Sequence, residues 1–424
     1  MKMKKSMWNL LERIVRKAVD KKFDYSFEDF DLGAIEGPVL LVTNHVCAWD
    51  PLLIALAAKR QLAFVASEHV FRIPRLGRLA EKYLDAIPHT KASSGTKATK
   101  ECIKRLRAGE AIFIASEGEQ SWDGKSKGVV ATTGKLVKKS GATLVTYRIE
   151  GGYIAFPRWA KGTRRGKVYV HPVKVYTPAE LEKMTAEEIK AAINRDISFD
   201  VWEWQREELL RNGKMNAYIS DKDCRAEYLE RLVYICPSCR KIGTLRSHGN
   251  EIECSCGFKN EITETGFLKD DTPFATVSEW SDWQDDELCK LLGGESEAES
   301  QAESKELEKA QGDSSQEKGF LGVECGDKDF VLLKINGDHT EEIVSEGEIA
   351  LGRIDGGFKL SVGDMSFDLS KISRMAMILA NRIVFSSNEM YYEIRPHDMK
   401  GRHNLRKYLV AWQRTNANAN EEEE

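Results

Sequence analysis

Two side chains in the segment LLVTNHVCAWDP, residues 40 to 51, have the types and spacing that acid–base chemistry needs. His45 follows an apolar run of strand length, and Asp50 comes five residues later, directly before Pro51. A carboxylate beside a histidine fixes the ring tautomer and stabilises the imidazolium that forms, so the pair can act as a general base. Two other interpretations stay open. His45 could be a hydrogen-bonded core residue, and Asp50 could cap a helix that begins at Pro51.

Four of the nine cysteines form two close pairs, CPSC and CSCG. In a reducing compartment, paired thiols indicate metal before disulfide. Cys236, Cys239, Cys254 and Cys256 are spaced so that two knuckles can bind one tetrahedral zinc ion, although four incidental thiols are the alternative. A module this small cannot bury a core, so we expect a structural zinc to supply its folding energy.

The length and composition set the number and class of the domains. A chain of 424 residues with 42% apolar content predicts two or three compact units. No segment reaches the roughly 20 apolar residues that span a bilayer, and the longest candidate, PLLIALAA, ends at Lys59. We therefore expect a cytoplasmic protein without a transmembrane helix.

Residues 1–27 are predicted to contain a basic amphipathic helix. Apolar residues recur at helical spacing from residue 7 to 22, with lysines and arginines on the other side. One interpretation is interfacial binding, with Trp8, Leu11, Ile14 and Val15 in the headgroup region and the basic residues attracting anionic lipid. The other is that the helix packs on the neighbouring domain.

Residues 28–230 have the pattern of an α/β domain. Apolar runs such as VLLVT and AIFIAS alternate with helical stretches such as TKATKECIKRLRAG. This alternation predicts a largely parallel sheet flanked by helices. In such a sheet, His45 comes at the carboxyl end of a strand, where ligands bind.

The C-terminal half divides into four further segments. We predict the zinc ribbon at 231–268, an acidic linker at 269–318, a β-rich domain with a C-terminal helix at 319–415 and a disordered tail at 416–424. The β-rich domain resembles pleckstrin-homology or GRAM-like modules through its run of strands and its final helix.

Four blocks in order resemble the 1-acylglycerol-3-phosphate acyltransferases and the wider glycerolipid acyltransferase family. NHVCAWD is similar to the family's NHxxxxD motif. SEHVFRIPRLGRLAEKYLDAIPHTK resembles the second block, ASEGEQSWDGKSKG resembles the Phe-Pro-Glu-Gly-Thr-Arg-Ser block, and ATLVTYRIEGG resembles the strand after it. The resemblance covers about residues 28 to 200.

The resemblance implies transfer of a fatty acyl group from an acyl carrier protein or coenzyme A thioester to the free hydroxyl of 1-acylglycerol-3-phosphate in phospholipid synthesis. His45 would take the hydroxyl proton, and Asp50 would orient His45. No covalent intermediate and no catalytic cofactor are implied. The lysophospholipid acceptor lies in a membrane, so we expect a peripheral protein on the inner face of the cell membrane.

The chain departs from the family pattern where a cation is expected to face the substrate phosphate. The family's Thr-Arg pair is Glu119-Gln120 here. Phosphate binding must therefore depend on other cations, and we predict these substrate-binding residues: Asn44, Lys91, Glu117, Gly118, Lys125, Lys127 and Arg148. The lysines could equally be solvated surface charges, and Glu117 could be a loop carboxylate.

Two functions of other classes compete with acyl transfer. Because the Thr-Arg pair is missing, the α/β domain could be a catalytically silent lipid-binding adaptor. The ribbon could be a nucleic-acid module, but KIGTLRSHGNEIE has too little clustered positive charge to favour that. We therefore expect no nucleic-acid partner.

Overall fold

The computed structural model describes residues 5–73, 77–78, 80, 86–92, 95–220, 222–270, 273–293, 328–354 and 357–416. Most of the predicted acidic linker and nearly all of the predicted tail, 416–424, lie outside these residues. The chain forms two compact units. Unit 1 comprises Met1–Glu227, His248–Glu251 and Asn260–Asp271, and unit 2 comprises Tyr228–Ser247, Ile252–Lys259 and Thr272–Glu424.

Unit 1 is built on a seven-stranded sheet with the order β1-β7-β6-β2-β5-β3-β4. The strands are β1 (Asp24–Phe27), β2 (Val39–Thr43), β3 (Ala63–Ser67), β4 (Ile87–His89), β5 (Ala111–Ala115), β6 (Thr143–Glu150) and β7 (Lys167–Tyr176). Strands β6, β2, β5, β3 and β4 are parallel, whereas β7 runs antiparallel to β6 and β1 runs with β7. The predicted, largely parallel α/β sheet is confirmed.

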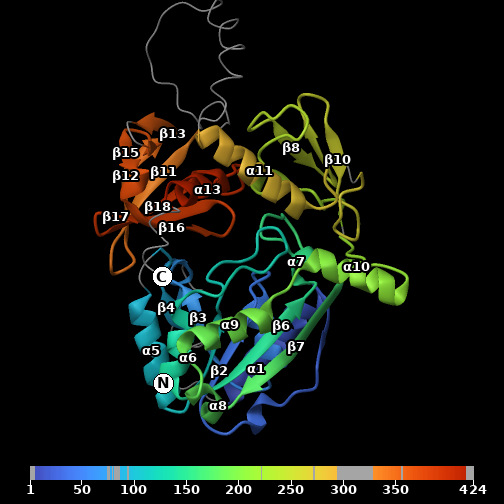
Figure 1. The fold of residues 1–424 in the computed structure, drawn as a ribbon, viewed down its shortest axis with the longest axis vertical. Coiled ribbons are helices and arrows are strands. Elements are labelled where there is room, and N and C mark those ends of the chain that lie inside the picture. The colour runs from blue at the N-terminus through green and yellow to red at the C-terminus, as the bar shows by residue number, and fades with distance from the viewer. Residues whose placement is uncertain are drawn as a thin grey trace, which may run out of the picture. The chain divides into compact units, whose positions relative to one another are not determined.

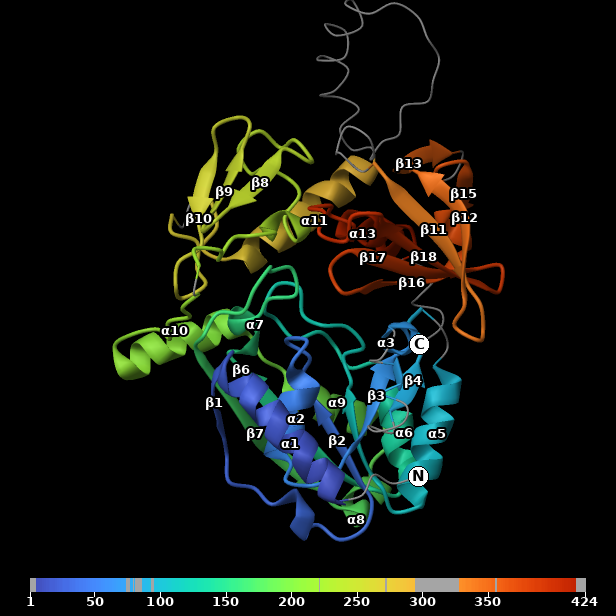
Figure 2. The same ribbon diagram turned by 180° about the vertical axis from the view of Figure 1, so that it is seen from behind.

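Helices cover both faces of this sheet. They are α1 (Lys5–Asp20), α2 (Asp50–Ala57), α3 (His69–Arg72), α5 (Thr96–Arg107), α6 (Thr132–Ser140), α7 (Gly152–Ala155), α8 (Pro178–Glu182), α9 (Ala186–Ile197) and α10 (Val201–Asn212). Figures 1 and 2 show α1 and α2 on one face and α5, α6 and α9 on the other. Strand β2 is buried along its whole length, which explains why its sequence, VLLVT, is a continuous apolar run.

The apolar residues of α1, which the sequence assigned to one face, differ in how far they are buried. Trp8, Leu11 and Val15 are half-buried, and α1 packs against α2. Leu10 and Ile14 are instead exposed, by 58% and 56%. The exposed apolar surface of the helix therefore agrees with the predicted one only at Ile14, and Leu10 replaces Trp8, Leu11 and Val15. Among the described helices, none has the length and apolar content to cross a bilayer.

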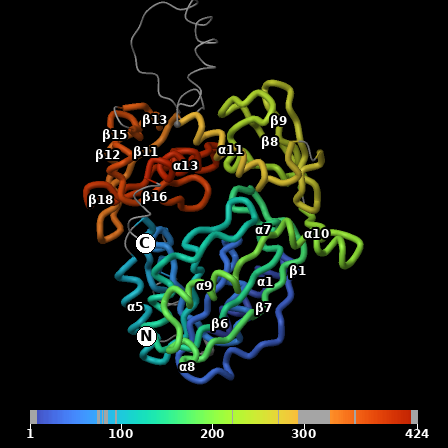
Figure 3. The backbone as a smooth tube through the Cα atoms, viewed as in Figure 1, coloured from blue at the N-terminus to red at the C-terminus, as the bar shows by residue number. Residues whose placement is uncertain are grey.

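Unit 2 contains most of the cysteine module and the C-terminal β-rich domain (Figure 3). Strands β8 (Leu245–His248), β9 (Glu251–Cys254) and β10 (Lys259–Glu261) form a three-stranded sheet. The part of the predicted acidic linker that the structure describes is largely folded. It forms α11 (Val277–Gly293), because Trp280, Leu288 and Leu292 are buried and stabilise a helix there.

The C-terminal domain consists of two antiparallel sheets and a helix. One sheet has the order β12-β11-β18-β17-β16 and the other β13-β14-β15. The strands are β11 (Phe330–Ile335), β12 (Glu341–Gly347), β13 (Ile349–Ile354), β14 (Gly357–Val362), β15 (Met365–Asp368), β16 (Ile372–Ile378), β17 (Arg382–Ser387) and β18 (Met390–Pro396). Helix α13 (Arg406–Thr415) follows them. The predicted β-rich domain with a final helix is confirmed.

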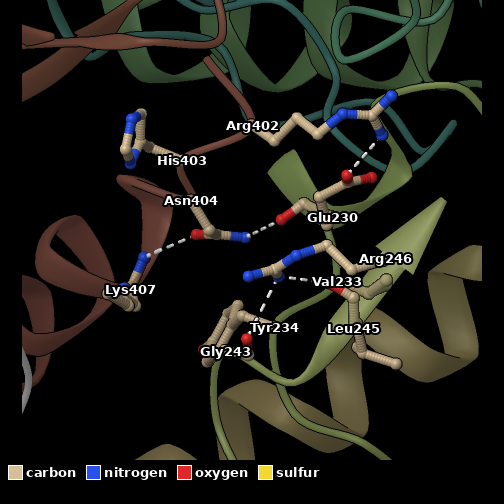
Figure 4. Close-up of a pocket in the computed structure, with 10 residues that line it drawn as sticks. All are labelled: Glu230, Val233, Tyr234, Gly243, Leu245, Arg246, Arg402, His403, Asn404 and Lys407. Atoms are coloured by element: carbon tan, nitrogen blue, oxygen red, sulfur yellow. Dashed lines mark hydrogen bonds and ion pairs between the residues drawn. The ribbon is translucent and has the colours of Figure 1, made fainter. Parts of the chain in front are cut away.

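A cavity of about 120 Å³ lies within unit 2, beside the first turn of α13 (Figure 4). Glu230 is 4% exposed and accepts a hydrogen bond from Arg402 at 2.6 Å. The Asn404 side chain donates to the Glu230 carbonyl at 3.1 Å and accepts from the backbone N–H of Lys407 at 3.2 Å. These bonds tie the segment before the cysteine module to the segment that leads into α13.

Candidate active site

The imidazole of His45 is held by a buried carboxylate. His45 lies in the loop between β2 and α2, and its Nδ1 is 2.7 Å from Oδ2 of Asp50. Asp50 is fully buried, whereas the His45 side chain is 20% exposed. With Nδ1 donating to the carboxylate, Nε2 carries the lone pair and can accept a proton. This arrangement is that of a general base with its orienting group.

Backbone donors fix the Asp50 carboxylate in this position. Its Oδ2 accepts from the N–H of Val46 at 2.7 Å and from that of Cys47 at 3.1 Å. The residue at the N-cap of α2 is Trp49, and no side chain caps this helix. The interpretation of Asp50 as a helix cap is therefore wrong, because its carboxylate points back to the loop that carries His45.

Glu117 links the loop after β5 to His45. Its carboxyl group is buried, with 5% exposure. One oxygen accepts from the backbone N–H of His45 at 3.1 Å, and the other from that of Lys127 at 2.8 Å. Burial raises the pKa of the Glu117 carboxyl to about 8, although the two backbone bonds act in the opposite direction. Glu117 thus ties the two ends of the 117–127 loop to the His45 backbone.

Asn44 joins the end of β2 to β6. Its amide is buried and bonds both backbone groups of Ile149, donating to the carbonyl at 3.0 Å and accepting from the N–H at 2.9 Å. On the other side of the loop, the His45 carbonyl accepts from the N–H of Ser121 at 2.8 Å. The backbone on both sides of the His45 side chain is therefore anchored to neighbouring strands and loops.

Among the predicted phosphate-binding cations, Arg148 bonds a backbone carbonyl through its side chain, whereas Lys125 is held through its backbone. The guanidinium of Arg148 donates to the Asp196 carbonyl, at 2.7 Å from one terminal nitrogen, and so holds the last turn of α9. The backbone of Lys125 pairs with that of Asp200. Gly118 is exposed and has φ of +72°, a conformation that favours glycine.

Lys91 and Lys127 belong to a cluster of charges around Glu119. The ammonium of Lys127 lies 3.2 Å from one Glu119 oxygen, and Lys91 interacts electrostatically with both Glu119 and Lys127. Burial alone would raise the pKa of the Glu119 carboxyl, but Arg158, Lys127 and Lys91 together hold it below its usual range. Glu119 is therefore an anion within a cationic cluster.

Arg158 is a member of this cluster that the sequence did not indicate. Its guanidinium donates to Glu119 at 2.7 Å and to the Gln120 carbonyl at 3.1 Å. It also lies over the Trp122 ring, 4.1 Å from the centroid, and the side chain is only 2% exposed. None of the motif blocks contains Arg158. The sequence points to such a residue only indirectly. An acidic residue, Glu119, stands where a cation is expected, and it needs a positively charged partner.

The four paired cysteines come together in space. Their sulfur atoms all lie within 4.8 Å of one another, and the Cys236–Cys256 and Cys239–Cys254 sulfur pairs are each 3.7 Å apart. A tetrahedral zinc with Zn–S bonds of about 2.3 Å requires S–S separations of about 3.8 Å. The four thiol groups therefore fit a structural zinc site.

One comparison with known proteins covers the part of the chain that contains His45. Residues 19–173 match the family model described as Acyltransferase. No curated protein matches the chain. Among solved structures, the chain is similar to the 1-acyl-sn-glycerophosphate (LPA) acyltransferase PlsC from Thermotoga maritima, with 21% identity, 45% of this chain and 76% of that chain covered, and a TM-score of 0.41. Residues 19–173 are thus an acyltransferase domain, which implies an acyl donor and an acyl acceptor.

Proposed function

We propose that this protein transfers a fatty acyl group from an acyl carrier protein or coenzyme A thioester to the free hydroxyl of 1-acylglycerol-3-phosphate. The observation that carries the proposal is the contact between His45 and the buried Asp50 inside a domain that matches the Acyltransferase model. The reaction belongs to phospholipid synthesis.

The proposed mechanism is direct acyl transfer with His45 as the general base. Nε2 of His45 takes the proton of the acceptor hydroxyl while its oxygen attacks the thioester carbonyl. The tetrahedral intermediate then expels the thiolate, which takes up the proton from the imidazolium, so that an ester and a free thiol result. Asp50 stabilises the imidazolium, and such a base contributes about 10²- to 10⁴-fold. No covalent enzyme intermediate and no catalytic cofactor are needed.

We further propose that the protein acts at the cytoplasmic face of a membrane, with anionic lipid as a partner. The exposed side chains of Leu10 and Ile14 on α1 lie next to Arg13 and Lys17, which are exposed as well. Apolar and basic groups on one helix surface are typical of interfacial binding. The zinc ribbon and the β-rich domain then accompany the acyltransferase domain as non-catalytic modules.

The release of free thiol tests this function. Purified full-length protein is mixed with 1-acylglycerol-3-phosphate and either acyl-coenzyme A or acyl carrier protein thioester, and the thiol and the diacyl product are measured. We expect both to form in equal amounts, and His45→Ala to abolish both while the melting temperature stays near that of the wild type. Turnover that survives in His45→Ala would overturn the mechanism.

Because the Thr-Arg pair is missing, a second function is also considered, that of a catalytically silent lipid-binding adaptor. This rival predicts binding to vesicles that contain 1-acylglycerol-3-phosphate, with no thiol released from either donor. The same assay therefore separates the two functions.

A further inference from the structure

We propose that Trp202 and Phe267 are positioning residues for His45. Trp202 lies on α10, and Phe267 lies on the segment Asn260–Asp271, which belongs to unit 1 although it follows the cysteine module in the chain. Both residues lie outside the part of the chain that matches the Acyltransferase model. The inference rests on the proposed function for the role of His45 as a base. The order of the His45 loop can be measured without turnover.

The turn at residues 121–124 holds the His45 backbone. The N–H of Ser121 donates to the His45 carbonyl at 2.8 Å. The Ser121 hydroxyl accepts from the N–H of Gly124 at 2.9 Å, which closes the turn. Gly124 has φ of +97°, and a Cβ there would lie 3.0 Å from the indole nitrogen of Trp202. The turn therefore packs directly against α10.

Two aromatic side chains fix the carbonyl groups of this turn. The indole N–H of Trp202 donates to the Asp123 carbonyl at 2.7 Å, and the Tyr153 hydroxyl donates to the Trp122 carbonyl at 2.8 Å. Helices α7 and α10, which carry the two donors, lie side by side (Figures 1 and 2). Tyr153 is 1% and Trp202 is 2% exposed. Both donors are therefore shielded from water, and the turn is held on the side of α10 as well as at His45.

The Phe267 ring packs on the edge of the Trp202 indole. The ring centroids are 5.4 Å apart and the planes are nearly perpendicular, at 85°. The same segment is attached to α10 a second time, because Gln205 donates to the Thr265 carbonyl at 2.9 Å. Gly266 lies so near α7 that a Cβ there would be 3.2 Å from a side chain of that helix. The segment after the cysteine module therefore fixes the orientation of the indole.

These contacts form a continuous path from Phe267 to His45. The Phe267 ring limits the movement of the Trp202 indole, and the indole N–H holds the Asp123 carbonyl. Two residues before Asp123, the Ser121 N–H holds the His45 carbonyl. A displacement of about 1 Å at a reacting group can lower a rate about 10²-fold. The path thus gives the segment that follows the cysteine module a role in acyl transfer.

Because contacts alone do not establish coupling, hydrogen–deuterium exchange of residues 119–125 is measured by mass spectrometry on full-length protein. Trp202→Phe keeps an aromatic ring and removes the N–H donor. Phe267→Leu removes the ring contact at a half-buried side chain. In both variants, we expect exchange of the turn to be about tenfold faster, the effect of losing one hydrogen bond. Exchange of α5 should stay as in the wild type.

Thiol release on the same proteins measures the consequence for the reaction. Both variants should lower kcat about 10- to 100-fold at nearly unchanged KM, because they leave the groups that bind the substrates in place. Phe267→Tyr retains the ring and should restore kcat. The matched control is Phe27→Leu, since this half-buried ring on β1 contacts Tyr25, 4.9 Å away between centroids. It should change neither exchange of the turn nor kcat.

The variants also separate positioning from folding. If Trp202→Phe is unfolded, Phe267→Leu and Phe267→Tyr decide, because the half-buried Phe267 can be replaced with less cost to the core. Unchanged exchange of the turn, or unchanged kcat despite faster exchange, in a folded variant would overturn the proposal. Equally faster exchange throughout unit 1 would do so too, since it indicates a role in stability alone. Faster exchange confined to the turn, with no thiol release by the wild type, would leave the path in place and reject the proposed acyl transfer.

Discussion

Replacing Asp50 with asparagine tests the orienting role of this carboxylate with the smallest change in shape. The amide oxygen of asparagine can occupy the place of Oδ2, because the N–H of Val46, at 2.7 Å, requires an acceptor there. The same oxygen would still accept from Nδ1 of His45. The substitution therefore keeps the imidazole tautomer and removes the negative charge, and it also replaces Oδ1, which accepts from the Cys47 thiol at 3.2 Å, with an NH2 group.

The cost of that lost charge can be worked from the distance between the two groups. Nδ1 of His45 and Oδ2 of Asp50 are 2.7 Å apart, and the opposite charges that form in the transition state are centred on the two groups at about 4 Å. At an effective dielectric constant of about 20, such a pair is worth about 4 kcal/mol. Since each 1.36 kcal/mol is a factor of ten in rate, we expect kcat to fall about 10³-fold.

The effect on stability should be smaller than the effect on the rate. The backbone bonds of Val46 and Cys47 to Asp50 become neutral rather than charge-assisted, which costs about 1–3 kcal/mol. For a unit of this size, that corresponds to a fall in Tm of about 2 to 12 °C. Thiol release and thermal unfolding are measured on the same preparation, so that loss of activity and loss of fold are distinguished.

Asp31→Asn provides the control for a true capping aspartate. Asp31 is exposed and accepts from the N–H of Gly33 at 2.8 Å at the start of a 3-10 helix. Asparagine caps about as well as aspartate, so this variant should keep both its activity and its Tm. A loss of less than about tenfold in Asp50→Asn would refute the orienting role, because the buried charge would then contribute little to the transition state.

Three further predictions concern other parts of the chain. The purified protein should hold one zinc, and Cys236→Ser should lose it, as metal analysis would reveal; a metal-free, folded wild type would contradict the site. For a phosphomonoester acceptor, kcat/KM should fall as pH rises above about 8, because Lys91 is charged only below its pKa of about 8; a neutral monoacylglycerol acceptor should lack this change. Leu10→Ser combined with Ile14→Ser should weaken binding to anionic liposomes by roughly tenfold or more per side chain at unchanged Tm, whereas the half-buried Trp8 should affect Tm instead.

Local patterns in the sequence were sufficient for the fold class and for the His45–Asp50 contact. The apolar run VLLVT indicates a buried strand because both faces of β2 are covered. The spacing of His45 and Asp50 spans a single loop and the first turn of α2, so the two side chains meet through local geometry alone. The two cysteine pairs likewise lie within short knuckles, and only one long-range contact is needed to join them.

The face of α1 could not be predicted in the same way. Helical periodicity identifies an apolar stripe, but it does not tell which part of that stripe packs on the protein. Leu10 and Ile14 are exposed, whereas Leu11 and Val15 turn toward the domain. That division depends on where α1 lies against α2, which is a tertiary contact between segments some 40 residues apart.

Arg158 illustrates why a missing motif residue is weak evidence for a missing charge. The Glu119-Gln120 pair removes a cation from the loop after β5. In the sequence, this change indicates only that the site loses positive charge. In the structure, a guanidinium from the segment after α7, 39 residues further along the chain, contacts Glu119 itself. The Glu119 carboxyl stays ionised in that loop because cations surround it, since an isolated buried carboxylate would take up a proton. When an acid replaces a cation in a motif, the positive charge must therefore come from another part of the chain. The residue that supplies it is found by its closeness in space to the acid.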